Sequence, residues 1–438
     1  MKAMHAILCF LPFAWTVSTW SDTVRPNVLL LVADDLGYGD IGAYGCKDIP
    51  TPNIDGLARD GIRFTDGYVS APVCSPCRAG IMTGRYQTRF GHELNLPGAD
   101  KYPGGMPQSE RTMANYFRDA GYATGHVGKW HLGNSHLPGY GAQDRGFTES
   151  IWYPGQKKLP PLTKYRNMQS DKDDAYINDA MARDAAEFIG RHRQEPWFLY
   201  VPFLAVHEPL DVPTDLEQKF NQLKPPKRRK MAALLWSMDQ AVGSILAALR
   251  QTRLEEQTLV VFLSDNGSYP KSSGSNGPLR GSKSNLFEGG IRVPFIMQWK
   301  SVLPAGAVYS QPVIALDLLP TGLAAAGVPA KPEWKLDGVN LLPYLQGEKS
   351  GPPHQTLYWR FGEQMAVRAG DWKLVRARED KGQVPPSPAL YHLSEDIGET
   401  QDLATQKPET VRDLQSSWDR WNAQQVKPLW GDSSTSVP

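Results

Sequence analysis

The sequence has little cysteine, almost no net charge and few long apolar runs, and each shortage excludes a class of protein. Four cysteines in 438 residues are too few for a disulfide-bonded scaffold. A formal net charge of +1 at pH 7 creates no overall field that attracts nucleic acid or a membrane. Beyond the first twenty residues we find no internal repeat and no segment long and apolar enough to cross a bilayer. We therefore expect a soluble protein that binds no nucleic acid, does not insert stably into membranes, and binds any anion through local charge.

The first residues have the layout of a secretory signal peptide. Lys2 precedes an apolar run over residues 6–17, and small polar residues follow as far as Ser21. This run is too short to span a membrane, and the residues before Cys9 do not form a lipid-attachment motif. A buried N-terminal strand or helix is the alternative, but the next segment already supplies a good first strand. We expect a signal peptide over residues 1–21 and export to the periplasm or the exterior.

Strand and helix patterns alternate along most of the chain. The helical stripe from Met231 to Leu249 is the clearest, and Thr51 and Ser109 are the expected N-caps of two shorter helices. Apolar runs of strand length occupy residues 28–33, 123–127, 197–203, 259–264 and 293–299. This alternation predicts an α/β fold: a large, mostly parallel sheet flanked by helices on both faces.

The alternation of strand and helix patterns ends near residue 345. A linker-like stretch is followed by four short strand candidates and a helix over residues 408–424. We expect a catalytic domain over residues 22–345 and a small C-terminal α+β subdomain, an antiparallel sheet plus a helix, over residues 346–430. Residues 431–438 are expected to be a disordered tail.

Polar and ionisable side chains follow four of the predicted strands directly. Ligands of open α/β sheets bind beyond the carboxyl ends of the strands, so these groups should meet in one composite site. The residues in question are Asp34 and Asp35 after the first strand, Lys129 and His131 after the second, His207 after the third, and Asp265 and Asn266 after the fourth.

Four of these residues offer only oxygen ligands: Asp34, Asp35, Asp265 and Asn266. Such a set suits a hard divalent cation, Ca²⁺ or Mg²⁺, better than zinc. Without a cation, converging carboxylates would repel one another. A single Asp after a strand often caps the next helix instead, but a doublet joined by a distant Asp-Asn pair favours the metal.

Cationic and protonatable residues are also abundant in these segments. Cations beside a metal form a pocket for a tetrahedral oxyanion such as sulfate or phosphate, and a histidine can act there as general acid or base. Any one of these histidines alone would more often be structural, so the interpretation rests on the group: Arg78, Lys129, His131, His207, Lys283 and Arg292.

The segment APVCSPCRAGIMTGRY places Cys74 just before an expected helix, because Pro76 fits the first helical turn. The positive end of the helix dipole favours anionic groups at that place. Cys74 and Cys77 form a C-x-x-C pair, so a redox pair is a second possibility. A thiol nucleophile is a third.

At this point the motifs together resemble those of the type I sulfatase family of the alkaline phosphatase superfamily. Cys74-Ser75-Pro76-Cys77-Arg78 followed by Thr83-Gly84-Arg85 is similar to the family signature C-x-P-x-R-x4-T-G-R. Similar motifs in family order are PNVLLLVADDLGYGDIG, GKWHLG, LSDNG and GSKSNLFEGGIRVP, and the C-terminal segments MAVRAGDWKLVR and LYHLSEDIGETQDLA also match. The resemblance spans about residue 25 to residue 405, and five ordered motifs are far more specific than any one.

The resemblance implies a catalytic residue made after translation. A separate maturation enzyme would oxidise Cys74 to formylglycine, whose hydrated aldehyde attacks the sulfur of a sulfate ester. The divalent cation, Ca²⁺ in preference to Mg²⁺, would be held by Asp34, Asp35, Asp265 and Asn266, together with the modified Cys74.

The resemblance also implies roles for the remaining groups. Lys129, Lys283 and Arg78 would neutralise charge on the sulfate and the diol. His207, with Lys283, would protonate the departing alcohol. His131 would then take the proton of the second hydroxyl, so that sulfate leaves and the aldehyde returns.

Two rival functions stay open. The sequence does not identify the substrate. A phosphate or phosphonate ester hydrolase would use the same residues, and a catalytically silent Ca²⁺- or glycan-binding module is a rival from another class. Loops over residues 92–107, 134–170 and 268–282 should surround the cleft. Residues 157–166 are basic and would suit an anionic polysaccharide, although a solvated loop is the safer interpretation. Export and the many aromatic residues favour a sulfated carbohydrate as substrate.

Overall fold

The structure is a computed structural model that describes residues 25–431, apart from residues 99–101, 103, 156 and 380–381. The expected signal peptide over residues 1–21 lies outside the described residues, and so does the expected disordered tail except for its first residue, Gly431. Both therefore stay predictions.

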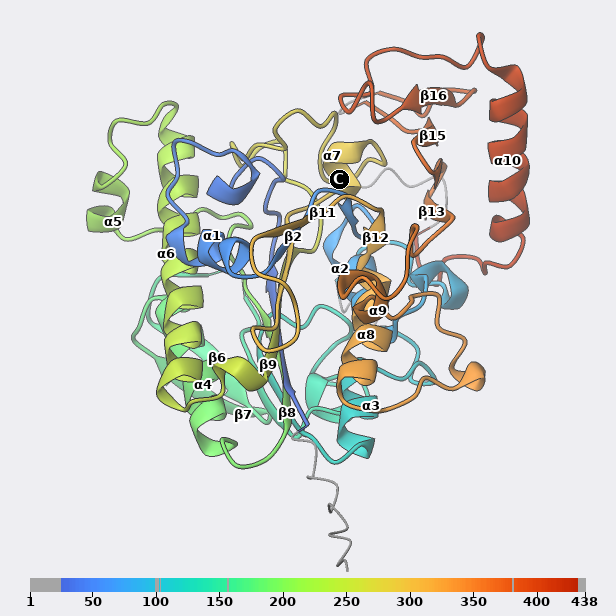
Figure 1. Cartoon of the computed structure of the whole chain (residues 1–438). Helices are drawn as coiled ribbons and strands as arrows, with labels where there is room; N and C mark the ends of the chain where they lie inside the picture. The colour runs from blue at the N-terminus through green and yellow to red at the C-terminus, as the bar shows by residue number, and fades with distance from the viewer. Residues whose placement is uncertain (1–24, 99–101, 103, 156, 380–381, 432–438) are drawn as a thin grey trace, which may run out of the picture.

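A ten-stranded mixed sheet forms the centre of the molecule (Figure 1). Its middle five strands, β9, β1, β8, β4 and β5, are parallel, as the strand–helix alternation predicts. β10 is antiparallel to β9, and β6 and β7 extend the other edge as an antiparallel hairpin. The order across the sheet is β11 (Ala307–Tyr309), β2 (Ile62–Phe64), β10 (Phe295–Gln298), β9 (Thr258–Ser264), β1 (Asn27–Ala33), β8 (Trp197–Pro202), β4 (Ala123–Gly128), β5 (Glu149–Trp152), β6 (Leu162–Arg166) and β7 (Gln169–Asp173).

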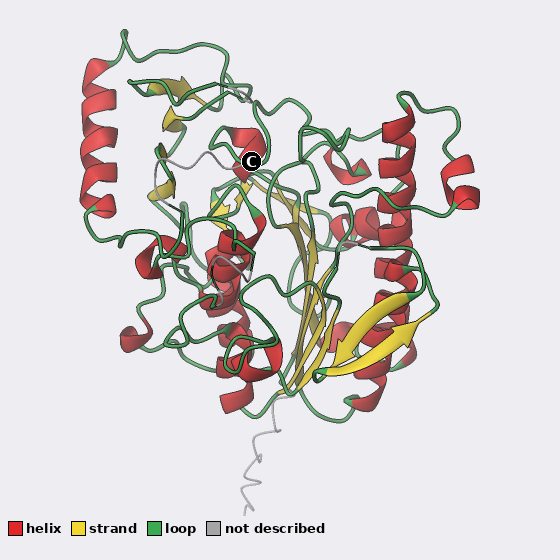
Figure 2. Cartoon of the chain, turned by 180° about the vertical axis from the view of Figure 1, so that it is seen from behind, coloured by secondary structure: helices red, strands yellow, loops and turns green. Residues whose placement is uncertain are grey.

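Helices cover both faces of this sheet, which Figure 2 shows edge-on between two helical layers. Alternate residues of β1 point to opposite cores: Val28 and Leu30 enter one apolar core, and Leu29 and Leu31 enter the other. The first core is completed by α2 (Cys74–Thr83), α3 (Met113–Asp119) and α8 (Leu318–Ala325), and the second by α1 (Pro52–Arg59), α4 (Ile177–Arg191) and α6 (Pro226–Gln251). Shorter elements are β3 (Gly67–Tyr68), α5 (Thr214–Gln218), α7 (Glu288–Ile291), β12 (Val313–Ile314) and α9 (Leu342–Leu345).

The longest helix corrects one expectation from the sequence. By length and composition α6 is apolar enough to cross a membrane, contrary to our expectation for the chain beyond its first twenty residues. However, 72% of its most apolar window is buried within the protein, and residues such as Leu234 and Val242 pack in the second core. Its hydrophobicity is therefore that of a central core helix.

Two helix starts also differ from the expected ones. α3 is capped by Thr112 and not by Ser109: the Thr112 hydroxyl accepts from the Asn115 N–H, and the Asn115 side chain accepts from the Thr112 N–H. Thr51 does stand at the N-cap of α1, but its hydroxyl accepts from Gly42 N–H instead of capping the helix. The first N–H groups of α1 donate to Asp239 of α6.

The C-terminal part forms a four-stranded antiparallel sheet with one helix, as predicted. The sheet shares the first core with α2 and α8, and the Trp359 indole donates to the carbonyl of Val69 in the main domain. This part therefore packs tightly on the rest of the chain (orange and red in Figure 1). Its elements are β13 (Thr356–Phe361), β14 (Gln364–Ala369), β15 (Trp372–Arg376), β16 (Ala389–His392) and α10 (Pro408–Asn422).

Candidate active site

The two acidic motifs meet at the carboxyl ends of β1 and β9. These strands are parallel neighbours in which Ala33 pairs with Ser264, so the residues that follow them emerge side by side. The Asp35 N–H donates to Asp265 Oδ1 at 3.2 Å, and Asn266 Nδ2 donates to Asp35 Oδ1 at 2.8 Å. The structure thus brings together the four residues proposed as metal ligands, and all four are buried.

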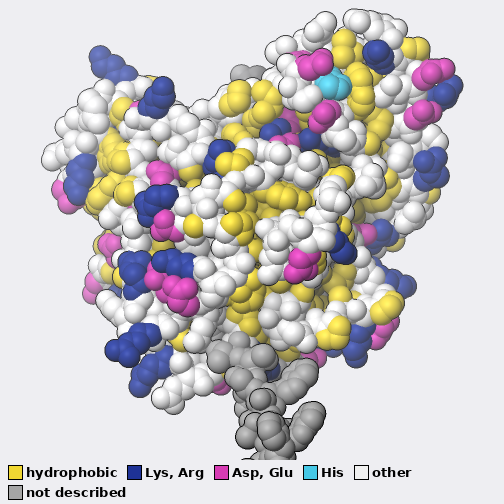
Figure 3. Space-filling view, in the orientation of Figure 1, with side chains coloured by type: hydrophobic (Ala, Val, Ile, Leu, Met, Phe, Trp, Pro, Cys, Tyr) yellow, Lys and Arg dark blue, Asp and Glu magenta, His cyan; other side chains and the backbone are white. Residues whose placement is uncertain are grey.

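Each of the three carboxylates is paired with a cation from another segment. Lys129 Nζ lies 2.7 Å from Asp34 Oδ2, Lys283 Nζ lies 2.7 Å from Asp35 Oδ1, and Arg78 Nη2 lies 2.6 Å from Asp265 Oδ2. Three negative and three positive charges therefore cancel. On the face seen in Figure 3, side chains of both signs are also interspersed.

The charge pairs set the protonation states of the acidic groups. Burial alone would raise the pKa of Asp34, but Lys129, His207 and Arg78 together hold it well below its ordinary value. Burial raises the pKa of Asp265 in spite of the adjacent Arg78. Asp34 is consequently a firm anion at neutral pH, fixed between the two strands.

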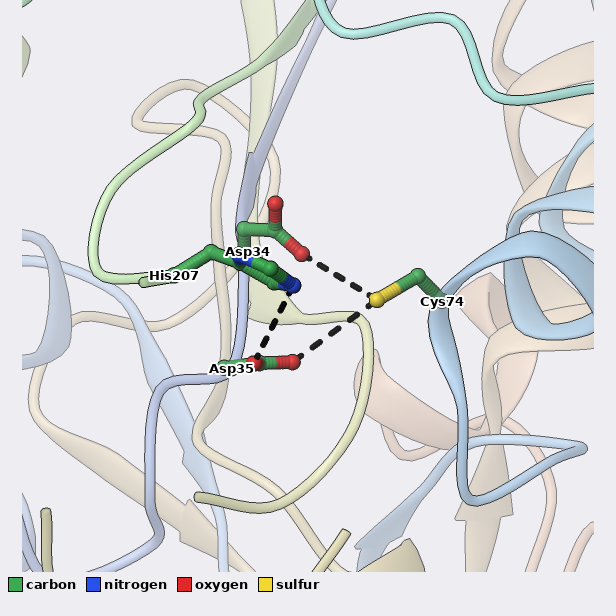
Figure 4. Close-up of side chains that lie close together, drawn as sticks. All are labelled: Asp34, Asp35, Cys74 and His207. Carbon is green, nitrogen blue, oxygen red and sulfur yellow. Dashed lines mark hydrogen bonds and ion pairs between the residues drawn. The ribbon is translucent and has the colours of Figure 1, made fainter. Parts of the chain in front are cut away.

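The Cys74 side chain points toward the carboxylates of Asp34 and Asp35 (Figure 4). Cys74 is the first residue of α2, and its Sγ lies 3.3 Å from Asp34 Oδ1, 3.7 Å from Asp35 Oδ1 and 3.3 Å from Lys283 Nζ. The helix packs closely against the side chain of Ser70 because residue 80 is glycine: an added Cβ would lie 2.3 Å from Ser70 Oγ. This packing fixes residue 74 against the carboxylates.

The thiol chemistry of Cys74 argues against the two thiol-based alternatives. Cys74 and Cys77 are both free, so they form no disulfide. Burial raises the pKa of both thiols well above the ordinary value, and the charge of Asp265 raises that of Cys74 further, against the opposing effect of two lysines. A buried, protonated thiol is a poor nucleophile and a poor redox group.

The residues around Cys74 fit a divalent cation. One donor atom each from Asp34, Asp35, Cys74 and His207 lies within 4.8 Å of the others. Asn266 Oδ1 is buried and has no hydrogen-bond partner among the described residues, although Nδ2 of the same side chain has two. A buried carbonyl oxygen without a donor normally has an explanation, and a hard metal ion provides one here because the donor set is rich in oxygen.

The two histidines of the predicted site have different surroundings. His207 Nε2 lies 3.7 Å from Asp35 Oδ2, and its Nδ1 lies 2.5 Å from the Glu208 carbonyl oxygen, to which it donates. His131 has a left-handed backbone with φ 58°, and its buried Nδ1 has no hydrogen-bond partner within the described part of the chain. Burial, followed by the charges of Lys129 and Arg78, lowers the pKa of His131 well below its ordinary value. His131 is therefore a neutral base beside the cations.

One cation proposed from the sequence lies elsewhere. Arg292 pairs with Asp66 and Glu288 and donates to the carbonyl of Thr65, so it belongs to a buried ion network beneath the C-terminal sheet. Arg292 stands directly before its predicted strand, residues 293–299, whereas the grouped site residues follow their strands, so it lacks the position that brings those residues to the carboxyl edge of the sheet.

The sequence analysis missed a supporting layer behind Cys74. The Ser75 hydroxyl donates to the His131 carbonyl oxygen at 2.7 Å and lies 2.5 Å from His92 Nε2, while the Ser75 N–H donates to Asn95. Burial lowers the pKa of His92 to about 3, so this ring is neutral. Ser75 stands inside the signature motif, but nothing in the sequence marks His92 or Asn95.

The basic stretch over residues 157–166 is not the solvated loop that we expected. Lys158 is fully buried and donates to the Pro209 carbonyl oxygen at 2.8 Å, close to His207 in sequence. Burial lowers the pKa of Lys158 to about 8. Lys164 is also buried and pairs with Asp173 and Asp184. Only the remaining basic residues of the stretch reach solvent.

Comparison with known proteins gives a consistent answer. The profile of the Sulfatase family matches residues 26–328, and that of the N-sulphoglucosamine sulphohydrolase C-terminal region matches residues 282–423. The chain is 34% identical to N-acetylgalactosamine-6-sulfatase of Canis lupus familiaris over 380 residues, covering 80% of this chain and 71% of that protein. It is 30% identical to Steryl-sulfatase of Homo sapiens over 448 residues, covering 82% and 76%.

Solved structures agree with this result. The crystal structure of Ps i-CgsB superposes with a TM-score of 0.87 at 33% identity, covering 93% of this chain and 94% of that one. The structure of the same protein in complex with k-i-k-neocarrahexaose gives a TM-score of 0.86 at 32% identity, with the same coverage. The family profile, the curated relatives and the fold therefore agree with one another.

Proposed function

This chain belongs to the sulfatase family and hydrolyses sulfate esters, and we propose that its substrate is a sulfated carbohydrate. The observation that carries the proposal is the position of Cys74, with its Sγ 3.3 Å from both Asp34 Oδ1 and Lys283 Nζ. The carbohydrate part is supported by relatives whose names contain N-acetylgalactosamine and by a structural neighbour in complex with k-i-k-neocarrahexaose.

Two additions to the chain complete the proposed chemistry. Formylglycine made from Cys74 supplies the oxygen that attacks sulfur, and a divalent cation, Ca²⁺ in preference to Mg²⁺, supplies positive charge beside it. Asp34, Asp35, Asp265 and Asn266 are the residues that would hold the cation. Because the protein's own three charge pairs cancel, a divalent cation leaves a net double positive charge, which suits a sulfate group.

The buried cations position and stabilise the reacting group. Lys129 and Lys283 are held by Asp34 and Asp35, and Arg78 is held by Asp265. Each donor is thus already oriented before substrate binds, and charge that develops on the sulfate oxygens meets fixed ammonium and guanidinium groups. Such preorganised donors in a site shielded from water are usually the largest contribution to catalysis.

The two histidines are placed for opposite proton transfers. The Glu208 carbonyl holds the Nδ1–H of His207, which leaves Nε2 to carry a proton to the departing alcohol oxygen. His131 is kept neutral by burial and by Lys129, so its Nδ1, which has no hydrogen-bond partner among the described residues, can accept a proton from residue 74 and release it later. One group gives a proton and the other takes one, as ester cleavage and regeneration require.

The proposal has a direct test in two measurements. Protein produced together with a formylglycine-generating enzyme should show an aldehyde at residue 74 by peptide mass spectrometry. That protein should hydrolyse 4-nitrophenyl sulfate much faster than 4-nitrophenyl phosphate, and the Cys74→Ala variant should hydrolyse neither. Faster turnover of the phosphate would contradict the sulfatase assignment in favour of a phosphate or phosphonate ester hydrolase.

We also propose that the protein is exported and matured by that separate enzyme. Support comes from Lys2 and the apolar run over residues 6–17, and from the C-x-P-x-R motif at residues 74–78. N-terminal sequencing of the protein recovered from the periplasm or medium should give a chain that starts close to residue 22. A chain recovered only from the cytoplasm, starting at Met1, would contradict export.

A further inference from the structure

Three aromatic rings from separate segments form a cluster at one end of the sheet. The Trp152 and Tyr165 ring centroids lie 5.3 Å apart, and the His136 ring contacts both, at 5.3 Å from Trp152 and 5.4 Å from Tyr165. His136 is exposed, and Trp152 and Tyr165 are half-buried. We call Trp152, Tyr165 and His136 the aromatic platform.

The platform lies beside the active site along the carboxyl edge of the sheet. Trp152 ends β5, where it pairs with Gly128 of β4, the residue directly before Lys129. Neighbouring strands lie about 4.8 Å apart, so the platform starts one strand away from a cation of the site. His136 belongs to the loop that follows His131, and the antiparallel bridge between Gly105 and Gly133 fixes that loop.

The hairpin that carries Tyr165 projects beyond this edge. β5 and β6 pair only through Ile151–Arg166 and Trp152–Tyr165, so the first residues of β6 reach past the end of β5 (the broad yellow arrows at the lower right of Figure 2). The connection between β5 and β6 also reaches toward the site, since Lys158 donates to the carbonyl of Pro209. The platform is therefore part of the rim.

The two faces of β6 differ in chemistry. Lys164 points to the α4 side, where it is buried and paired with Asp173 and Asp184. Tyr165 points to the opposite side with Trp152, whose ring packs against the first core. Arg166, two residues after Lys164, also lies on the α4 side, where its side chain is 39% exposed and pairs with Asp184 at 3.4 Å. The face with Tyr165 and Trp152 therefore offers aromatic surface, which suits the C–H face of a sugar ring.

We propose that the aromatic platform binds a sugar ring next to the one that carries the scissile sulfate, so that the substrate is an oligosaccharide or polysaccharide. The C–H face of a pyranose packs against Trp and Tyr rings, and partly exposed aromatic clusters beside a cleft commonly mark ligand grooves. This inference rests on the proposed function and adds to it a second binding position and a minimum substrate length.

Binding can be measured separately from turnover. The Cys74→Ala variant should bind ι-carrageenan or chondroitin 6-sulfate oligosaccharides of two, four and six sugars more tightly than it binds galactose 6-sulfate, as measured by calorimetry. Adding Trp152→Ala should weaken the oligosaccharide by about tenfold and leave galactose 6-sulfate unchanged. Trp334→Ala is the matched control, because Trp334 makes a similar ring contact with Tyr116, at 4.5 Å, in the segment between α8 and α9.

The outcomes separate this inference from the proposed function. Equal affinity for galactose 6-sulfate and every oligosaccharide, or no effect of Trp152→Ala on the longer ones, overturns the platform even if 4-nitrophenyl sulfate is hydrolysed. In the matured enzyme, Trp152→Ala should leave kcat/KM for 4-nitrophenyl sulfate unchanged. If wild-type enzyme fails to hydrolyse that ester, the proposed function fails, and the calorimetry still decides the platform. Thermal unfolding of each variant shows whether a loss of affinity or activity comes from misfolding.

Discussion

Lys283 Nζ lies 3.3 Å from the Sγ of Cys74, although 209 residues separate the two in the sequence. The same ammonium group contacts both oxygens of Asp35, at 2.7 and 2.9 Å. It therefore links the residue that becomes the nucleophile to one of the carboxylates, and it cannot leave Cys74 without breaking a buried ion pair. This relationship makes Lys283 the most direct test of the proposed charge arrangement.

Lys283→Ala should lower kcat/KM for 4-nitrophenyl sulfate by about two to three orders of magnitude, because an oriented positive charge at the reacting group is lost. The aldehyde content at residue 74 must be measured in parallel, so that a defect in maturation is not mistaken for a catalytic one. Lys271→Ala, an exposed lysine in the preceding loop, should retain full activity. Normal activity of the Lys283 variant at normal aldehyde content would contradict the assignment.

Asn266→Ala should weaken binding of the divalent cation by about 10- to 100-fold. The physical reason is the buried Oδ1, which lacks a donor within the described residues and therefore has a vacant lone pair for the metal. After treatment with a chelator, activity is titrated back with Ca²⁺ and with Mg²⁺. The variant should need more of either ion, whereas Asn221→Ala, at an exposed position, should match the wild type. An unchanged titration curve would remove Asn266 from the ligand set.

Ser75→Ala should reduce kcat by about tenfold and destabilise the fold by about 1–3 kcal/mol. The variant loses the hydrogen bond to the His131 carbonyl and the contact with His92 Nε2, so His131 is held less firmly and a buried imidazole loses its partner. Kinetics and chemical denaturation give the two quantities. Ser244→Ala, on the exposed side of α6, is the control. A fall in stability with unchanged kcat would assign Ser75 to folding alone.

Asp239→Ala should destabilise the protein by about 2 kcal/mol without changing kcat. Asp239 of α6 accepts hydrogen bonds from the N–H groups of Asn53 and Ile54, at 3.0 and 2.9 Å, and so caps a helix to which it does not belong. Denaturant unfolding measures the loss, with the exposed Asp413→Ala as control. A change below about 0.5 kcal/mol would show that water replaces this cap.

Glu399→Gln should flatten the dependence of stability on pH between about pH 4.5 and 7. Burial, together with Glu288, raises the pKa of Glu399 from 4.5 to about 7, although Lys373 lies 2.9 Å away. Lys373 acts mainly on Glu288, whose pKa it and Arg292 lower to about 2 in spite of burial.

The sign follows from proton binding. Between these pH values the folded protein keeps a proton on Glu399 that the unfolded chain has lost, so the free energy of unfolding decreases as the pH rises. The variant lacks this titration and should gain up to about 3 kcal/mol over the wild type at pH 7.5 relative to pH 4.5. Unfolding in denaturant at several pH values measures this difference in the free energy of unfolding, with Glu395→Gln as the exposed control. Parallel curves for wild type and Glu399→Gln would show that Glu399 is ionised in the folded protein.

The sequence alone determined the α/β fold class and predicted which residues of the candidate site lie together. The runs at 28–33 and 259–264 are apolar throughout because both faces of a central parallel strand are buried, and that continuity marks where each strand stops and Asp34 or Asp265 begins. Since parallel strands end at one edge, position after a strand was sufficient to group Asp34, Lys129, His207 and Asp265. The motif around Cys74 then added the residue that no strand signal marks.

Tertiary structure decided what depends on contacts between distant segments. Arg292 and Lys283 lie nine residues apart, yet one joins a structural ion network and the other reaches Cys74. Asp239 likewise caps a helix that is distant from it in the sequence. No local pattern encodes which buried charge pairs with which, because the choice is made by packing once the whole sheet is formed. The aromatic platform likewise exists only because β5, β6 and the loop after His131 meet at one edge.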